Sequence, residues 1–132
     1  LAEAIVSAVK DGGDHLILLG LAGSCFEKAA LEAGVLFAAE AFADRAYQED
    51  GSLVPRKQPG AVIHDVHLAA DRVIKMVREG TIETINGAEI HLRPHSICLH
   101  GDTPGAVSMA RAIREALSQA GVTVSCLKEV LE

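Results

Sequence analysis

The sequence predicts an α/β fold built around a parallel β-sheet. Along the chain, short apolar runs typical of buried strands alternate with stretches in which apolar residues recur at helical spacing. Hydrophobic residues make up 49% of the 132 residues and aromatic residues only 3%, so the core is expected to consist of Ala, Val, Ile and Leu. Such a composition suits parallel strands covered by helices, and the length suits a single domain.

Four elements are predicted before residue 43 from the spacing of apolar residues and from glycines that end helices. They are a helix over 1–11, a strand over 15–19, a helix over 24–33 capped by Ser24, and a strand over 35–42. Glu40 interrupts the second strand, where a carboxylate is costly unless it has a partner or faces a polar site. Glu40, Asp44 and Arg45 are therefore expected either to share a functional site or to form an ion pair that fastens the next loop.

The segment 46–60 combines Gly51, Pro55, Pro59 and Gly60 with charged residues. It is too long for an ordinary connection between a strand and a helix, and loops of this length are commonly lids or binding loops. We therefore expect it to be mobile and to close over the site, rather than to form a packed element.

The rest of the chain predicts two helices, a hairpin and a strand. In order they are a helix over 65–79 that Gly80 ends, a ribbon with strands at 81–85 and 88–92, and a strand over 97–99. A helix capped by Thr103, with Pro104 in its first turn, follows and is ended by Gly121, and a short strand or helical turn is expected within 121–132. Asn86-Gly87 in the ribbon favours a type I′ turn. His64 and His67 lack a third ligand at metal-binding spacing, so we expect them on the surface.

Charge and cysteine content exclude several classes of protein. The net charge is −6 and Lys and Arg form no cluster, which argues against nucleic acid as a partner because phosphate binding depends on concentrated positive charge. No apolar run approaches the roughly 20 residues that cross a bilayer. Cys25, Cys98 and Cys126 are widely spaced and suggest neither a disulfide framework nor a zinc site. We expect a soluble, cytoplasmic protein that binds neither nucleic acid nor membranes.

A polar turn, His100-Gly101-Asp102, separates the predicted strand over 97–99 from the helix that follows. In parallel α/β folds ligands bind at this edge of the sheet, where the loops vary and helix N-termini present unpaired N–H groups. His100 and Asp102 are therefore candidate catalytic residues. The alternative is a capped connection without chemistry, in which Asp102 or Thr103 only accepts backbone N–H bonds.

Four blocks of sequence match motifs of one known family in order and spacing. They are Glu40-Ala41-Phe42-Ala43-Asp44-Arg45-Ala46-Tyr47, Gly51-Ser52-Leu53-Val54-Pro55-Arg56, Pro59-Gly60-Ala61-Val62-Ile63-His64-Asp65 and His100-Gly101-Asp102-Thr103-Pro104-Gly105-Ala106-Val107. With these blocks the chain resembles the LamB/YcsF family, the family of 5-oxoprolinase A subunits, over nearly its whole length. The resemblance implies a (β/α) barrel-like fold related to the glycoside hydrolase and deacetylase superfamily. Such a barrel needs about 250 residues, so residues 1–132 would be its C-terminal portion, with the N-terminal half absent.

The resemblance also implies an enzyme, an ATP-dependent 5-oxoprolinase that opens 5-oxo-L-proline to L-glutamate together with partner B and C subunits. A five-membered lactam is a poor electrophile, so hydrolysis would proceed by phosphorylation of the amide oxygen and addition of water to the activated carbon. His100 or Asp102 would then be the base or its orienting partner, and Glu40 would be a further catalytic residue.

Four further residues are expected to bind substrate or phosphate on this hypothesis. Arg45 would be a counter-charge with Asp44 beside it, and the helix start at Thr103 and Gly105 would contact an anion. ATP is the expected cofactor, and whether a divalent metal ion is also bound is left open by the sequence. No G-x-x-x-x-G-K-[ST] loop occurs in the sequence, so ATP would be held in another way or mainly by one of the partner subunits.

Two alternatives remain open from the sequence. The first is a metal-dependent, deacetylase-like hydrolase of carbohydrate or amide substrates that uses His100, Asp102 and upstream carboxylates around a divalent ion. The second is a non-catalytic assembly fragment. A requirement for ATP in product formation separates the 5-oxoprolinase from the deacetylase-like enzyme.

Overall fold

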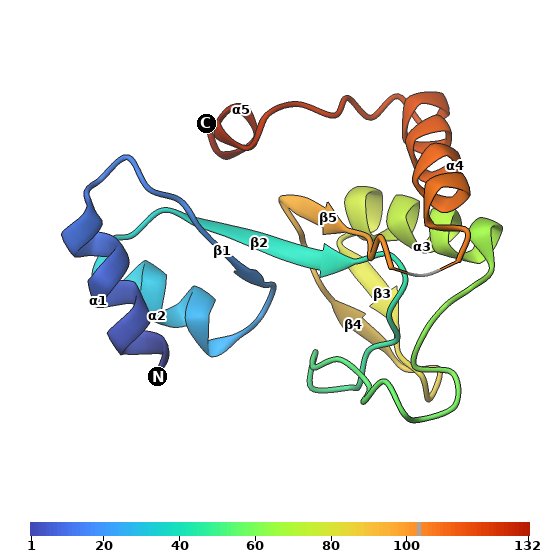
Figure 1. The fold of residues 1–132 in the computed structure, drawn as a ribbon, viewed down its shortest axis with the longest axis horizontal. Coiled ribbons are helices and arrows are strands. Elements are labelled where there is room, and N and C mark those ends of the chain that lie inside the picture. The colour runs from blue at the N-terminus through green and yellow to red at the C-terminus, as the bar shows by residue number, and fades with distance from the viewer. Residues whose placement is uncertain (103) are drawn as a thin grey trace.

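The computed structural model describes residues 1–102 and 104–132 (Figure 1); helices and strands alternate as far as the third strand, two more strands follow it, and two helices end the chain. The helices are α1 (Ala2–Gly12), α2 (Cys25–Ala33), α3 (Val66–Glu79), α4 (Ala106–Gln119) and α5 (Leu127–Leu131). The strands are β1 (Leu18–Leu21), β2 (Phe37–Phe42), β3 (Thr81–Glu83), β4 (Glu89–His91) and β5 (Ser96–Cys98). The predicted succession of elements is confirmed, and of the two alternatives for 121–132 the structure shows the helical turn, α5, rather than the short strand.

Strands β1, β2 and β5 form a parallel sheet with β2 in the middle. Leu21 of β1 pairs with Glu40, and Phe42 at the end of β2 pairs with Cys98 of β5. The chain passes from β1 to β2 through α2, and from β2 to β5 through α3 and the antiparallel ribbon of β3 and β4. The fold is therefore α/β with a parallel sheet, and the carboxyl ends of β2 and β5 lie at the same edge.

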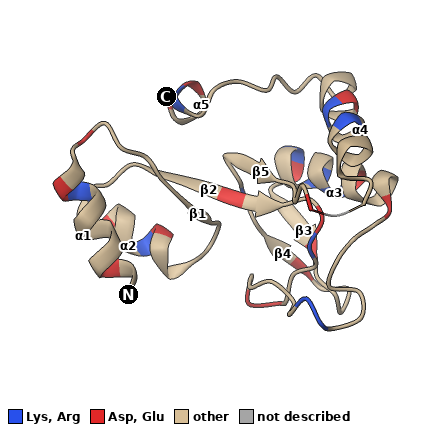
Figure 2. Ribbon diagram, viewed as in Figure 1, with Lys and Arg blue, Asp and Glu red and all other residues tan. Residues whose placement is uncertain are grey.

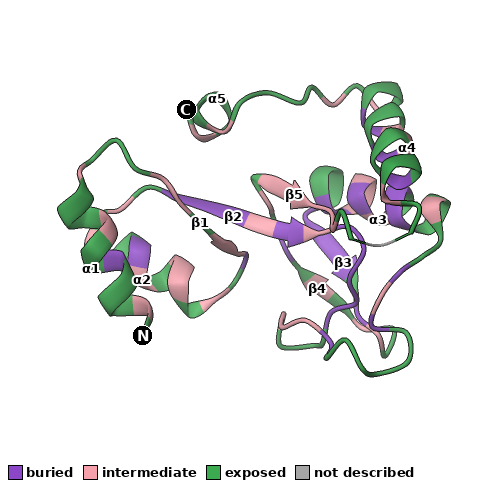
Figure 3. Cartoon of the chain, viewed as in Figure 1, coloured by how far each residue is buried: buried purple, intermediate pink, exposed green. Residues whose placement is uncertain are grey.

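Small and β-branched side chains form the core around β2. Ala39, Ala41 and Ala43 are almost completely buried, as are Val73 and Met76 of α3. Figure 3 shows buried segments along β2 and β3 and on parts of α3 and α4, which pack against each other. The core thus has the composition expected from a sequence rich in small apolar residues and poor in aromatic ones.

Glycines and one aspartate set the ends of two helices. Asp65 caps α3, because its Oδ1 accepts the backbone N–H groups of His67 and Leu68, each at 2.9 Å. Gly34 and Gly80 follow α2 and α3 in the left-handed conformation, with φ of 69° and 67°. The prediction that glycines end these two helices is therefore confirmed.

Other predicted boundaries are wrong. β1 begins at Leu18 rather than at residue 15, and no strand follows α4 in the described residues. Helix α4 begins at Ala106, because Gly105 occupies the cap position with a left-handed φ of 86° and the chain turns before it can enter the helix. Pro104 therefore lies before the helix rather than in its first turn. The predicted cap Thr103 lies outside the described residues.

The ribbon between β3 and β4 is present, but its turn is not of type I′. That turn requires a positive φ at Asn86, and no described residue other than glycine has one. Instead the Gly87 N–H donates to the Thr84 carbonyl at 3.0 Å, and the Thr84 N–H donates to the Ala88 carbonyl at 2.7 Å. With Gly87 at φ 84°, the connection is a type I turn followed by a left-handed glycine, a common longer hairpin loop.

The segment 46–60 is packed in part, although residues 48–50 are exposed. Ala46, Tyr47 and Val54 are buried, and Ala46 and Val54 form a small cluster with Ala61. The Ala46 N–H donates to the Ala61 carbonyl and the Val54 N–H to the Ala46 carbonyl, both at 3.0 Å. The expectation that this segment is not a packed element is wrong for these residues, because their apolar side chains give the loop a core of its own. Residues 55–60 are exposed.

Charged residues are distributed over the described chain rather than gathered in one patch. Lys and Arg occur on several helices and on the loop after β2, interspersed with Asp and Glu (Figure 2). In the two described ranges, no helix combines the length and the apolar character needed to cross a membrane.

Candidate functional site

The site lies where β2 and β5 end side by side. Phe42 and Cys98 are the last paired residues of the two strands, and beyond them the Ala43 N–H donates to the Cys98 carbonyl at 2.9 Å. This bond continues the register past the strand ends, so Asp44 and His100, two residues further along each strand, become neighbours. The two residues are 56 positions apart in the sequence, and the pairing of β2 with β5 brings them together.

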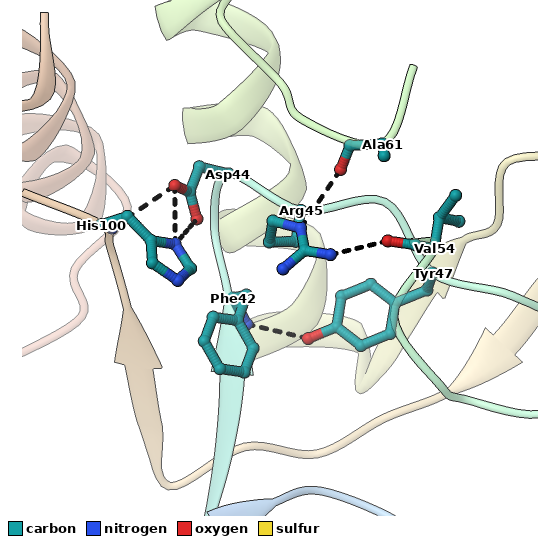
Figure 4. Close-up of polar contacts among 7 residues, drawn as sticks. All are labelled: Phe42, Asp44, Arg45, Tyr47, Val54, Ala61 and His100. Atoms are coloured by element: carbon teal, nitrogen blue, oxygen red, sulfur yellow. Dashed lines mark hydrogen bonds and ion pairs between the residues drawn. The ribbon is translucent and has the colours of Figure 1, made fainter. Parts of the chain in front are cut away.

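Asp44 and His100 form a hydrogen-bonded pair (Figure 4). Nδ1 of His100 lies 3.0 Å from Oδ1 and 2.9 Å from Oδ2 of Asp44, and the His100 backbone N–H donates to Oδ2 at 3.4 Å. Because an ionised carboxylate only accepts hydrogen bonds, the proton lies on Nδ1. Nε2 then carries the free lone pair, and it points away from Asp44 (Figure 4).

Burial differs between the two partners in a way that suits proton transfer. The side chain of Asp44 is 2% exposed, whereas that of His100 is 23% exposed. A buried carboxylate that holds one imidazole nitrogen fixes the ring's tautomer and orientation and stabilises the charge that forms when the other nitrogen takes a proton. The arrangement can therefore work as a general base whose reactive nitrogen faces outward.

Phe42 supports the imidazole from one side. The rings of Phe42 and His100 are stacked, with centroids 5.4 Å apart and an interplanar angle of 17°. Together, the carboxylate at the edge of the imidazole and the phenyl ring against its face restrict both rotation and tilt.

Glu40 and Cys98 complete the polar surroundings of the pair. Glu40 is half-buried on β2, two residues before Phe42 and on the same side of the strand. Burial raises the pKa of the Cys98 thiol, and the negative charges of Glu40 and Asp44 raise it further. Cys98 is therefore a neutral thiol near both carboxylates, and the predicted site residue Glu40 lies within β2, two residues before the strand ends.

Arg45 has a different environment from the one predicted. Its guanidinium is buried and donates from Nη2 to the Val54 carbonyl at 2.6 Å and from Nε to the Ala61 carbonyl at 3.4 Å. Arg45 thus fastens the loop through backbone carbonyls (Figure 4), and within the described residues it forms no ion pair. Its side chain in this structure points into the loop rather than toward His100.

The other predicted site residues form no hydrogen bond with the pair among the described residues, or cannot be placed. Asp102 is exposed, and the structure brings Asp44 rather than Asp102 to His100. Gly105 caps α4 with its backbone. Thr103 lies outside the described residues.

Sequence reasoning missed that Asp44 is the partner of His100, and it missed Cys98 and Tyr47. A signal for the pairing exists, because Asp44 and His100 each stand two residues beyond a strand, and such positions meet when the strands are neighbours. Tyr47 is the only tyrosine of the chain and is fully buried, with its Oη accepting the Phe42 N–H at 2.8 Å. Nothing in its sequence spacing indicates that contact.

A metal site does not fit the described residues. No group of three or more His, Cys, Asp or Glu side chains among them is arranged to hold a metal ion. Nδ1 of His100 is already engaged by Asp44. A metal-dependent hydrolase would need further ligands from outside the described part of the chain.

Comparisons with known proteins agree with this architecture. Two curated relatives are named as the A subunit of 5-oxoprolinase: one from Coprothermobacter proteolyticus is 52% identical over 132 residues, which are 100% of this chain and 51% of the relative, and one from Paracidovorax citrulli is 48% identical over 123 residues, 93% and 49%. The crystal structure of a lactam utilization protein from Thermus thermophilus matches with a TM-score of 0.84 and 45% identity, covering 93% of this chain and 49% of that one.

The chain thus spans about half the length of the relatives that it matches. The match includes the blocks around Asp44 and His100, since the relative from Coprothermobacter proteolyticus aligns with the whole chain. The family model described as the LamB/YcsF family likewise matches residues 1–132. The chain therefore belongs to the LamB/YcsF family.

Proposed function

We propose that this chain is part of the A subunit of a 5-oxoprolinase and supplies the general base for hydrolysis of 5-oxo-L-proline to L-glutamate. The observation that carries the proposal is the pair formed by buried Asp44 and partly exposed His100 at the ends of β2 and β5. The names of the relatives support the substrate class, since one group is named for 5-oxoproline and the Thermus protein for lactam utilization. The finer fold proposed is the C-terminal portion of a (β/α) barrel-like enzyme.

The reaction requires activation of a lactam whose carbonyl carbon is a poor electrophile. In the proposed sequence the amide oxygen takes the γ-phosphoryl group of ATP and ADP leaves. Water then adds to the activated carbon while Nε2 of His100 accepts its proton. The C–N bond breaks, the imidazolium returns the proton to the departing nitrogen, and a second water releases phosphate to leave glutamate.

Asp44 acts through His100 in this scheme. It keeps the proton on Nδ1, so that Nε2 is the basic nitrogen, and its negative charge stabilises the imidazolium. Glu40 is proposed as a second carboxylate near the reacting atoms. We propose B and C subunits as partners, since the relatives' name specifies one subunit and so implies a complex of several. We propose that these partners hold ATP, because the sequence of this chain has no G-x-x-x-x-G-K-[ST] loop.

The proposal is tested by ATP-dependent release of glutamate from 5-oxoproline, measured on the complete protein that contains these residues, assembled with its partner subunits. His100→Ala should reduce turnover about 10²–10⁴-fold, the usual cost of removing a positioned proton-transfer group. Asp102→Asn should change turnover little, because Asp102 is exposed and, among the described residues, forms no hydrogen bond with Asp44 or His100.

His15→Ala is the matched control, because it removes an exposed imidazole that precedes β1, at the opposite edge of the sheet from the site. Near-normal turnover of His100→Ala would overturn the proposal. A large loss in Asp102→Asn together with a small loss in Asp44→Asn would transfer the orienting role to Asp102. Glutamate release without ATP would favour a simple hydrolase.

A further inference from the structure

The end of β2 has a backbone donor that the sheet does not satisfy. Even-numbered residues of β2 direct their backbone groups toward β1, where the Ala22 N–H still reaches the Glu40 carbonyl at 2.9 Å. After Ala22 the chain turns away into α2, which begins at Cys25. The next donor on this side of β2, the Phe42 N–H, therefore has no strand to pair with, and an unpaired N–H at a buried position is costly.

The phenol of Tyr47 takes the place of the missing strand partner. Its Oη accepts the Phe42 N–H at 2.8 Å, and the whole residue is buried, at 0% exposed. Burial raises the pKa of Tyr47 to about 12, so the phenol is neutral at physiological pH. A neutral hydroxyl is a suitable acceptor for a backbone amide in the core.

The backbone of Tyr47 is itself held firmly from the other side. Its carbonyl accepts the Ile85 N–H at 2.9 Å, which ties it to the ribbon, and Tyr47 also forms a β-bridge with Leu53 within the loop. The position of the phenol is therefore fixed by the backbone of Tyr47 and by burial. It connects the loop after β2 and the β3–β4 ribbon to one amide at the end of β2.

That amide belongs to the residue whose ring stacks on His100. Phe42 places its phenyl ring 5.4 Å from the imidazole, and Asp44 follows two residues later. Movement of the Phe42 backbone would shift the ring that limits the tilt of His100, and it would also shift the carboxylate that holds Nδ1.

We propose that Tyr47 is a positioning residue for His100, acting through the backbone of Phe42. The inference deepens the proposed function and rests on it for its catalytic meaning. A purely structural role for Tyr47 would be filling of the core, which a phenyl ring of the same size would serve equally well.

The experiment compares wild type and Tyr47→Phe by NMR in the complete protein that contains these residues. The variant keeps the ring and removes only the hydroxyl. The Phe42 amide should exchange with solvent roughly tenfold or more faster relative to the other amides of β2, because it loses its partner. The Nδ1 proton resonance of His100 should shift or broaden as the imidazole becomes less well held.

Ile82→Val is the matched control, since it removes a methylene from a buried side chain without touching the site. It should lower overall stability and leave the His100 resonance unchanged. If Tyr47→Phe also leaves that resonance and the Phe42 exchange unchanged, Tyr47 is only a core residue and the inference is wrong. If Tyr47→Phe does not fold, Phe42→Leu tests the same link, and an unchanged His100 resonance in that variant overturns it.

The assembled enzyme supplies a second, independent readout. Tyr47→Phe should lower kcat for 5-oxoproline and leave KM nearly unchanged, because the hydroxyl contacts Phe42 rather than substrate. Should His100→Ala retain turnover while the NMR changes occur as expected, the positioning of His100 by Tyr47 stands and the proposed catalytic role fails. The two failures are therefore distinguishable.

Discussion

Two buried polar side chains near the strand ends serve different purposes. The carboxylate of Asp44 faces two donors of His100, the Nδ1–H and the backbone N–H. Two opposing effects act on the pKa of Tyr47. Burial raises it, whereas the hydrogen bond to Phe42 and the nearby charges of Arg72 and Arg45 lower it. Burial has the larger effect, so the phenol stays neutral. One residue thus supplies charge to the site, and the other supplies a fixed acceptor to the backbone.

The titration of Tyr47 predicts a pH dependence of stability. Its pKa is raised from the ordinary value of 10.0 to about 12, so the native state favours the protonated phenol. This contribution is fully present below pH 10 and is lost as the pH rises from 10 toward 12, by on the order of 2–3 kcal/mol in the free energy of unfolding. Denaturant titrations at a series of pH values measure the loss.

Because Tyr47 is the only tyrosine and the chain has no tryptophan, the ultraviolet absorbance of tyrosinate reports its ionisation directly. Tyr47→Phe is the control for other groups that titrate in this range. It should remove most of the decline between pH 10 and 12. An absorbance midpoint near 10 in the folded protein would contradict the assigned burial.

At the scale of the elements, His95 joins the start of β5 to β2. Its backbone N–H donates to the Ala39 carbonyl at 2.7 Å, and its Nδ1 accepts the Ala39 N–H at 3.0 Å. The imidazole thus continues the sheet one residue beyond the strand. No sequence pattern indicates this role, because His95 stands in a connecting segment and is exposed.

His95→Ala should therefore destabilise the chain more than replacement of an exposed histidine usually does. The Ala39 N–H is buried, and leaving it without an acceptor costs about 1–3 kcal/mol in the free energy of unfolding. His15→Ala is the comparison, with an expected change within about 0.5 kcal/mol. Equal stability of the two variants in urea titrations would show that the Nδ1 bond contributes nothing.

The loop after β2 depends on Arg45 in a similar way. Arg45→Met keeps much of the length of the side chain but leaves the Val54 and Ala61 carbonyls without their donor. Trypsin should then cut at Arg56 or Lys57 roughly tenfold faster or more, because cleavage requires the loop to open. Arg111→Met on the exposed side of α4 is the control, and equal cleavage rates in the two variants would refute the anchoring role.

Most elements could be predicted from the sequence, whereas the composition of the site could not. Helices such as α3 follow from apolar periodicity with Asp65 and Gly80 at the ends, and these signals are local. The pairing of Asp44 with His100 depends on which strands are neighbours, and β2 and β5 are separated by a helix and a ribbon. The predicted start of α4 is wrong. Thr103-Pro104 is a good local cap signal, but Gly105 is left-handed and occupies the cap position instead.

At the scale of the whole molecule, the site depends on the alignment of β2 with β5. β5 pairs with β2 on one side in the described sheet, and a largely apolar cavity of about 570 Å³ lies beside it, lined by Ile97, Ile113, Leu117 and Val130 among others. Neither Asp44 nor His100 lines this cavity. The proposed chemistry therefore takes place at the strand ends rather than in the cavity.

A double-mutant cycle on Asp44 and His100, read as ATP-dependent glutamate release by the assembled enzyme, tests most directly whether the two residues act as one unit. Asp44→Asn and His100→Ala should each reduce turnover about 10²–10⁴-fold. The double variant should be no slower than the worse single variant, because Asp44 has no catalytic effect once the imidazole that it orients is gone. Reductions that multiply in the double variant, with all three proteins folded, would show that the residues act independently and would contradict the account.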